Sequence, residues 1–263
     1  MMCNTEFSTA INHSFSGAVD YYHEHSKIQK EAAERLANAL DPWLYSIPEG
    51  ELLEIGCGTG FFTDHLIRMF PKRDKVITDL SPEMVDFCKN RFSEQEQITF
   101  DVLNAEEAEF KEDKYGLIVG NYVAQWFRQP AMTLEKLSKS LKVGGVMLLA
   151  FPGDDSYPEW KKYCLDLGIP YTANTFPDIE QLVIHLSMGP VQVDFYEDQT
   201  RESHDDVYSF FRHLKNSGTS ANLERKSLSY KQLKLLNDHW VERQGGSIEV
   251  TYHNVFLALK RVA

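Results

Sequence analysis

The stretch that decides the fold is residues 51–62, ELLEIGCGTGFF. Residues 51–55 have the apolar composition of a buried strand, and they lead directly into Gly56, Gly58 and Gly60. Glycine tolerates positive φ angles and lets a ligand come close to the backbone. A helix that starts after such a turn also presents unpaired backbone N–H groups to a ligand. The stretch therefore predicts a strand–turn–helix unit that binds a ligand.

Strands and helices alternate around this unit as far as residue 151. The pattern predicts strands at 51–55, 75–78, 98–102, 115–121 and 146–151, and helices at 27–40, 59–70, 82–92 and 130–141. Strands that alternate with helices in this way form a mostly parallel, doubly wound sheet.

After residue 151 the pattern changes. We expect two helices within 152–190, strands at 190–200 and 247–259, and a helical stretch from 203 to 243 between those strands. The chain is therefore divided into an N-terminal lid or helix (1–45), a ligand-binding core (46–151), a helical cap or insertion that contributes one core strand near 190–200 (152–246), and a final strand (247–263).

The composition excludes several classes of protein. The chain has 263 residues, 43% of them hydrophobic and 25% charged, as is typical of a globular domain. A net charge of −12 argues against nucleic-acid binding, which needs a basic surface. No apolar run approaches the ~20 residues that cross a bilayer, and we expect neither a signal peptide nor membrane association. Cys3, Cys57, Cys88 and Cys164 form no paired motif, so we expect reduced thiols in a cytoplasmic protein.

Two local features bear on possible partners. His23 and His25 lie two residues apart without a third ligand at a suitable spacing, so we expect no metal. Residues 201–234 contain seven Lys or Arg and four Asp or Glu, which gives a local charge of +3 and leaves about −15 for the remainder. This basic segment is either ordinary surface variation or a docking patch for an anionic partner.

Polar side chains stand at the ends of the first four predicted strands. Glu54 precedes the glycines, Asp79 ends the second strand, Asn104-Ala105 follows the third and Asn121 ends the fourth. The carboxyl ends of parallel strands are where such sheets bind ligands. An acidic residue after the second strand can accept both hydroxyls of a ribose.

These motifs, EIGCGTG followed by DLS and NAE, resemble those of the class I methyltransferases that depend on S-adenosylmethionine (SAM). The resemblance covers residues 50–151. It implies a Rossmann-like, mostly parallel seven-stranded sheet with an antiparallel last strand and a helical cap. It also implies SAM as the cofactor and S-adenosylhomocysteine as its product.

The same resemblance implies which residues surround SAM: Tyr22, Glu54, Gly56, Cys57, Gly58, Gly60, Asp79, Leu80, Asn104, Ala105 and Asn121. Asp79 would hold the ribose hydroxyls and Leu80 would flank the adenine. Asn104 and Ala105 would face the adenine amine. The family usually has Asp at the position of Asn104; because an amide carbonyl can still accept from an amino group, we expect weaker binding rather than none.

Four further segments resemble one family more closely, the malonyl-acyl-carrier-protein O-methyltransferases of biotin synthesis. They are INHSFSGAVDYYHEHSKIQ (11–29), NYVAQWF (121–127), VYSFFRHLKNSGTS (207–220) and VTYHNVFLALKR (250–261). The resemblance spans nearly the whole chain. Val19 and Thr219 depart from it, since the family has alanine at both positions.

This resemblance implies methylation by SAM of the free carboxylate of malonyl carried on an acyl carrier protein. That carboxylate is ionised at pH 7 and needs no general base, so no catalytic dyad is expected. The basic segment would dock the acidic carrier protein, and we expect a monomer. Candidate substrate-binding residues are Tyr22, Trp126, Phe176, Arg212, Lys215, Tyr252 and His253. The sequence leaves open whether Arg212 or Lys215, and whether Tyr252 or His253, faces the substrate.

Three alternatives stay open from the sequence alone. The acceptor could be a small free acid, as in the trans-aconitate methyltransferases, which share the core but not the 201–261 motifs. A nicotinamide-dependent oxidoreductase is disfavoured by Phe61, which stands where the dinucleotide fingerprint has Gly or Ala. The third alternative is a SAM-binding protein without catalytic activity.

Overall fold

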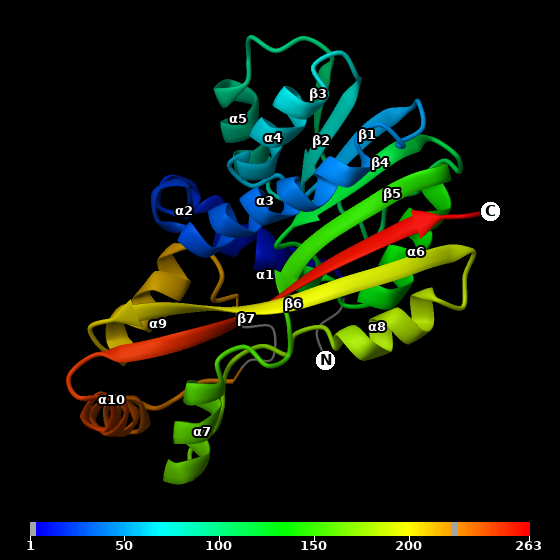
Figure 1. Cartoon of the computed structure of the whole chain (residues 1–263). Helices are drawn as coiled ribbons and strands as arrows, with labels where there is room; N and C mark the ends of the chain where they lie inside the picture. The colour runs from blue at the N-terminus through cyan, green and yellow to red at the C-terminus, as the bar shows by residue number, and fades with distance from the viewer. Residues whose placement is uncertain (1–3, 222–225) are drawn as a thin grey trace.

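Seven strands form one sheet in the order β3-β2-β1-β4-β5-β7-β6 (Figure 1). The computed structural model describes residues 4–221 and 226–263. The strands β1 to β5 pair in parallel, whereas β7 runs antiparallel between β5 and β6. The predicted fold class is therefore confirmed. The strands are β1 (Glu51–Ile55), β2 (Lys75–Asp79), β3 (Ile98–Val102), β4 (Tyr115–Asn121), β5 (Leu141–Pro152), β6 (Val191–His204) and β7 (Ile248–Arg261).

Helices cover both faces of the sheet and gather at one end of it. In chain order they are α1 (Asn4–Ser16), α2 (Val19–His25), α3 (Lys27–Leu40), α4 (Phe61–Met69), α5 (Pro82–Arg91), α6 (Pro130–Ser140), α7 (Pro158–Leu167), α8 (Ile179–Leu186), α9 (Val207–Asn216) and α10 (Tyr230–Gln244), with short 3-10 turns η1 (Asp41–Trp43) and η2 (Ala124–Trp126). None of the helices within the described ranges is long and apolar enough to cross a membrane.

Two element boundaries differ from the sequence prediction for local reasons. The helix predicted at 59–70 begins at Phe61, because Gly60 caps it in the left-handed region with φ +86°. The strand predicted at 146–151 begins five residues earlier, at Leu141. Gly144 (φ +81°) and Gly145 do not end this strand; they lie in an irregularity where its register against β4 shifts.

The core consists of two apolar layers, one on each face of the sheet. Leu52 and Leu117 point to the layer under α3 and α4, whereas Leu53 and Ile118 point to the layer under α6 and α8. Successive side chains of a strand face opposite sides, and here both sides are covered. All seven residues of β4 are buried as a result. Because β4 is fixed from both faces, the polar residues at its carboxyl end have a rigid support.

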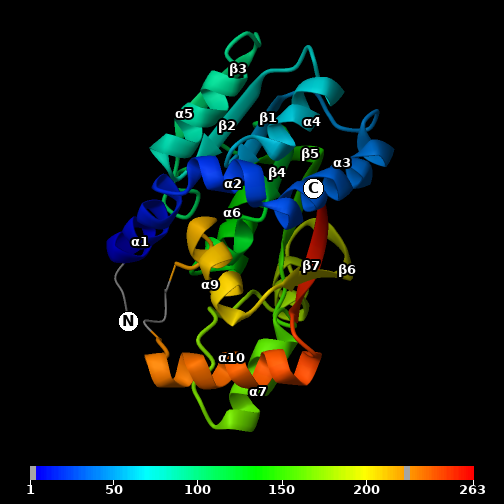
Figure 2. The same ribbon diagram turned by 90° about the vertical axis from the view of Figure 1, so that its left-hand side faces the viewer.

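The last third of the chain builds a cap at the carboxyl edge of the parallel strands. β6 and β7 pair along their whole length, from Val191 with Arg261 to His204 with Ile248, and extend beyond the parallel strands (Figure 1). Helices α7, α9 and α10 gather around the far end of this ribbon. Figure 2 shows α1 and α2 on the same side of the molecule as α9. The turn after α9 contacts α1, since a Cβ at Gly218 would lie 2.9 Å from Phe15 Cδ1.

We expect Leu117→Ala to lower the free energy of unfolding by about 2–5 kcal/mol, because it removes a fully buried side chain from the centre of the sheet. Urea denaturation followed by circular dichroism measures this loss. Leu165→Ala is the matched control, since Leu165 is 80% exposed and should change stability by less than about 0.5 kcal/mol. Equal effects of the two substitutions would contradict the assignment of the core.

Candidate active site

The three glycines after β1 have different structural roles. Their φ angles are +69° at Gly56, +52° at Gly58 and +86° at Gly60. A Cβ at Gly56 would lie 2.8 Å from Val123, and one at Gly60 would lie 2.6 Å from Phe92. Gly56 and Gly58 line a cavity, whereas Gly60 packs against the protein interior.

Asp79, at the end of β2, fixes this loop from the side. One carboxylate oxygen accepts from the N–H of Gly58 at 2.8 Å, and the other accepts from the N–H of Ser81 at 2.9 Å. Burial raises the pKa of Asp79, while the N–H donors oppose that shift. Each oxygen keeps a further lone pair, so the carboxylate can also accept from a ligand in the cavity.

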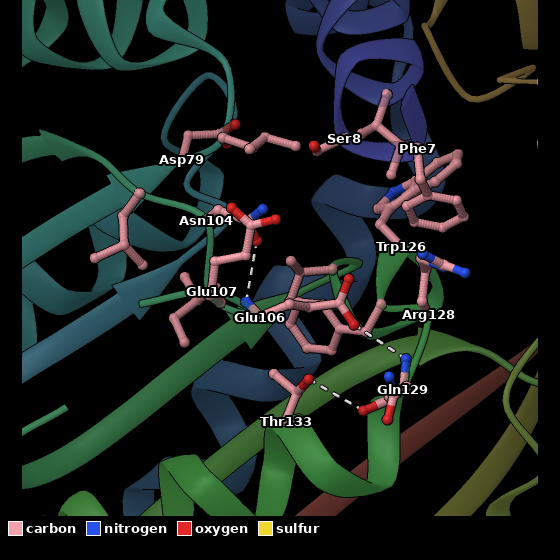
Figure 3. A pocket seen from close by; sticks show the side chains of 18 of the residues that line it. Phe7, Ser8, Asp79, Asn104, Glu106, Glu107, Trp126, Arg128, Gln129 and Thr133 are labelled. Atoms are coloured by element: carbon pink, nitrogen blue, oxygen red, sulfur yellow. Dashed lines mark hydrogen bonds between the residues drawn. The ribbon is translucent and has the colours of Figure 1, made fainter. Parts of the chain in front are cut away.

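The cavity has a volume of about 390 Å³ and lies between the strand ends and α1 (Figure 3). Asp79 and Asn104 lie on one side, and Phe7, Ser8 and Trp126 face them from the other. Of the residues that the sequence analysis assigned to the cofactor, the cavity brings together Tyr22, Gly56, Gly58, Asp79, Leu80, Asn104, Ala105 and Asn121.

Glu54, Cys57 and Gly60 do not line this cavity. Glu54 is 1% exposed, accepts from the Thr63 hydroxyl at 2.7 Å and points into the interior. Burial raises the pKa of Glu54 well above its usual value. Cys57 is buried as a free thiol beside Cys88. These three residues lie behind the glycine loop rather than in the cavity wall, so their contact with a cofactor stays a prediction.

Asn121 lines the cavity and has a buried side-chain acceptor without a partner in the part of the chain that the structure describes. Its side-chain nitrogen donates to the carbonyl of Gln29 at 2.9 Å, which fixes the orientation of the amide. Its side-chain oxygen is buried and has no partner among the described residues. Asn104 differs, because its side-chain oxygen already accepts from the N–H of Glu106 at 3.0 Å. A ligand that fits here should therefore bring an N–H or ammonium group to Asn121.

A second cavity of about 300 Å³ adjoins the first. The two share Tyr122 and Trp126. Seven aromatic side chains contribute to its wall: Tyr122, Trp126, Tyr157, Trp160, Phe176, Phe211 and Tyr252. Its polar residues include Lys215, Lys226 and His213. Burial lowers the pKa of His213 to about 4, so the imidazole is neutral at pH 7 and the two lysines supply the positive charge.

The sequence left open which member of two residue pairs faces the substrate, and the structure shows which member of each pair lines the second cavity. Tyr252 lines the second cavity, whereas His253 faces the other side of β7, where its Nε2 lies 2.8 Å from Glu197. Lys215 lines the same cavity, whereas Arg212 is exposed on the outer surface of α9. His253 and Arg212 therefore lie outside the second cavity, which Tyr252 and Lys215 line.

Tyr122 is the main site residue that the sequence analysis missed. It adopts φ +56°, which non-glycine residues rarely do, and its N–H donates to Ala150 at 2.6 Å. Its hydroxyl hydrogen-bonds to the Asn254 side-chain oxygen, and the Asn254 amide donates to Asp198 and Thr200 at 2.9 Å each. The only signal in the sequence was its position directly after Asn121. The N-terminal residues Phe7, Ser8, Ile11 and Phe15, which line the first cavity, were also missed.

For SAM, the cofactor that the sequence motifs imply, Asp79→Ala should weaken binding by about 1–3 kcal/mol, or roughly 5- to 150-fold in Kd. The reason is the loss of the acceptor beside Gly58. Calorimetric titration measures the change. Ser81→Ala is the control, because it removes the hydroxyl that accepts from Met84 and donates to Glu83 but keeps the backbone N–H that donates to Asp79. An unchanged SAM affinity in Asp79→Ala would show that this carboxylate does not contact the cofactor.

Comparison with known proteins agrees with this geometry. The profile of a family described as a methyltransferase domain matches residues 53–147, from β1 to the start of the buried part of β5. In the solved YcgJ protein of Bacillus subtilis the fold is similar, with a TM-score of 0.62 at 17% identity over 88% of this chain and 99% of that one.

Curated relatives extend the match beyond the core. A malonyl-acyl-carrier-protein O-methyltransferase of Magnetococcus marinus is 31% identical over 210 residues, which cover 79% of this chain and 76% of that protein. One from Anoxybacillus flavithermus is 30% identical over 258 residues, covering 92% and 93%. A biotin biosynthesis bifunctional protein of Bordetella avium is 27% identical over 91% of this chain and 50% of its own length. The chain therefore belongs to the malonyl-acyl-carrier-protein O-methyltransferase family, and it is a SAM-dependent methyltransferase with the class I fold.

Proposed function

We propose that this protein methylates the free carboxylate of a malonyl group carried on an acyl carrier protein, with SAM as the methyl donor. The observation that carries the proposal is the junction of the two cavities at Tyr122 and Trp126. A cofactor in the first cavity and an acceptor in the second would meet there. The names of the full-length relatives support the same acceptor.

The residues of the first cavity fit SAM group by group. Asp79, Leu80 and Ala105 line this cavity. Asp79 would offer its remaining lone pairs to the ribose hydroxyls, and Leu80 and Ala105 would flank the adenine. The unpaired Asn121 oxygen suits the ammonium group of the methionine part. Tyr22 covers Gly58, since a Cβ on that glycine would lie 3.4 Å from the Tyr22 ring. When bound, SAM supplies an electrophilic methyl group on a cationic sulfonium.

The chain contributes alignment and the exclusion of water rather than proton transfer. A malonyl carboxylate is already ionised at pH 7, so no base has to activate it. Burial raises the pKa values of Tyr22 and Tyr122, so both hydroxyls stay protonated beside the reaction site. The reaction joins an anion to a cation, and charge disappears in the transition state, so dry aromatic walls favour it. Holding oxygen, methyl carbon and sulfur in line lowers the barrier further.

The polar rim of the second cavity suits a substrate on a charged carrier. Lys215 and Lys226 stand where the phosphate of a phosphopantetheine arm would pass, and Arg212 lies outside them on α9. These cations belong to the basic segment 201–234, of which Glu224 and Arg225 lie outside the described residues. An acidic carrier protein would be repelled by a chain of net charge −12 unless the docking surface were locally basic. Free thiols at Cys57 and Cys88 fit a cytoplasmic enzyme.

The proposal is tested with purified protein and SAM labelled on the methyl group. Malonyl-acyl-carrier protein, malonyl-coenzyme A and free dicarboxylic acids are offered in parallel, and mild base is used to release label from an ester. We expect base-labile label on the carrier protein well above that on the free acids. Label on a free acid alone would refute the carrier-bound acceptor and keep the methyltransferase chemistry. SAM binding without any transfer would refute the proposed reaction.

Charge reversal on α9 should separate carrier docking from the chemistry. We expect Arg212→Glu with Lys215→Glu to lower kcat/KM for malonyl-acyl-carrier protein at least tenfold more than for a small malonyl thioester, because the carrier is acidic. The matched control is Lys72→Glu with Lys111→Glu, two exposed lysines that line a separate cavity beside Glu51, at the amino end of β1. If both substrates lose activity equally, these residues act in the cavity and do not dock the carrier.

A further inference from the structure

Gln125 lines the second cavity, and its side-chain amide has a buried acceptor without a partner among the described residues. Gln125 lies in η2, which two residues separate from the end of β4, and its Nε2 donates to the carbonyl of Tyr122 at 2.7 Å. A backbone carbonyl only accepts, so the amide cannot be turned around without losing this bond. Its Oε1 is buried and has no partner in the described part of the chain. The orientation of this buried acceptor is therefore set by the protein before a substrate arrives.

The position of Gln125 assigns that acceptor to the substrate side. Gln125 lines the second cavity but not the first, and it is the neighbour of Trp126 and the hydrogen-bond partner of Tyr122. Those two residues mark the junction of the cavities. A group that extends from the junction into the second cavity passes Gln125.

The chemistry of the substrate identifies the missing donor. At pH 7 a malonyl thioester has a carboxylate and a thioester, and both groups only accept hydrogen bonds. A free dicarboxylate likewise offers no donor. The nearest N–H on a carrier-bound substrate is the amide separated from the sulfur by two methylene groups. A buried acceptor left without a donor is costly, and it discriminates strongly against substrates that lack the matching group.

Resting on the proposed function, we infer that Gln125 Oε1 accepts a hydrogen bond from the amide of the carrier's arm nearest the sulfur. Gln125 thereby selects thioesters whose arm carries an amide over substrates without one. It is a specificity-determining residue and takes no part in the transfer of the methyl group.

The test uses acyl carrier protein loaded with two malonyl arms that differ at one atom. One is the natural arm, and in the other an oxygen replaces the N–H of the amide nearest the sulfur. The values of kcat/KM for both are measured with the wild type, Gln125→Leu and Gln125→Met. Methionine is unbranched and close in size to glutamine, so Gln125→Met keeps the test valid even if Gln125→Leu does not fold. Phe176→Leu, in the wall of the same cavity, is the control.

We expect the wild type to prefer the natural arm by about tenfold or more. Both Gln125 variants should bring that ratio close to one, mainly by losing activity on the natural arm. Phe176→Leu should lower both activities and keep the ratio. A wild-type ratio near one, or a ratio that survives in both Gln125 variants, overturns the inference while the proposed function stands. If the wild type fails to methylate the natural arm, the proposed function itself is wrong and the inference fails with it.

Discussion

The contact on which the site depends is the hydrogen bond from the Gly58 N–H to the Asp79 carboxylate, at 2.8 Å. It joins the loop after β1 to the end of β2, two strands that pair in parallel. Gly58 can take part because its φ of +52° is accessible to glycine without strain. The same carboxylate accepts from Ser81 and so also fixes the start of α5. One buried acid thus sets the shape of the loop, the entry into the next helix and one polar side of the first cavity.

The second half of the site depends on a different kind of constraint. Tyr122 follows β4 in a left-handed conformation, which costs on the order of 1–3 kcal/mol and persists only where the surroundings enforce it. Here the surroundings are Asn254 and Asp198 on β7 and β6, and Asp198 is in turn paired with Arg35 on α3. The antiparallel ribbon therefore does more than complete the sheet. It holds the aromatic ring of Tyr122, at which the first cavity meets the second.

A methyl transfer from a cation to an anion makes modest chemical demands, and the site reflects this. Among its polar groups, Asp79 holds the loop, and Asn121 and Gln125 have single acceptors with fixed orientation. Aromatic side chains contribute much of the remaining wall of the second cavity. Such a site is specific through shape and through a few hydrogen bonds, because an unpaired buried acceptor disfavours every ligand that lacks the matching donor. For the carrier-bound acceptor that we propose, discrimination is therefore available at the carrier's arm rather than at the reacting carboxylate.

Sequence reasoning succeeded where the signal is local or follows from strand order. The glycine loop, the positions of β1 to β4 and the placement of Asp79, Asn104 and Asn121 at the cavity all follow from apolar periodicity and from the rule that parallel strands end at one edge. It does not give the direction of a side chain where that direction depends on packing. Glu54 adjoins the glycines in sequence, yet it points to Thr63 because α4 covers that face of β1.

What the sequence by itself determined is the parallel core with its ligand loop, since backbone propensities and side-chain alternation act over a few residues. What only the tertiary structure decided is which side chains line the second cavity. Tyr252 rather than His253 lines the second cavity because β7 lies between β5 and β6, which fixes the face that each side chain takes. Tyr122 depends on Asn254, 132 residues further along the chain. Contacts over that separation are set by the folded topology, and no local pattern in the sequence encodes them.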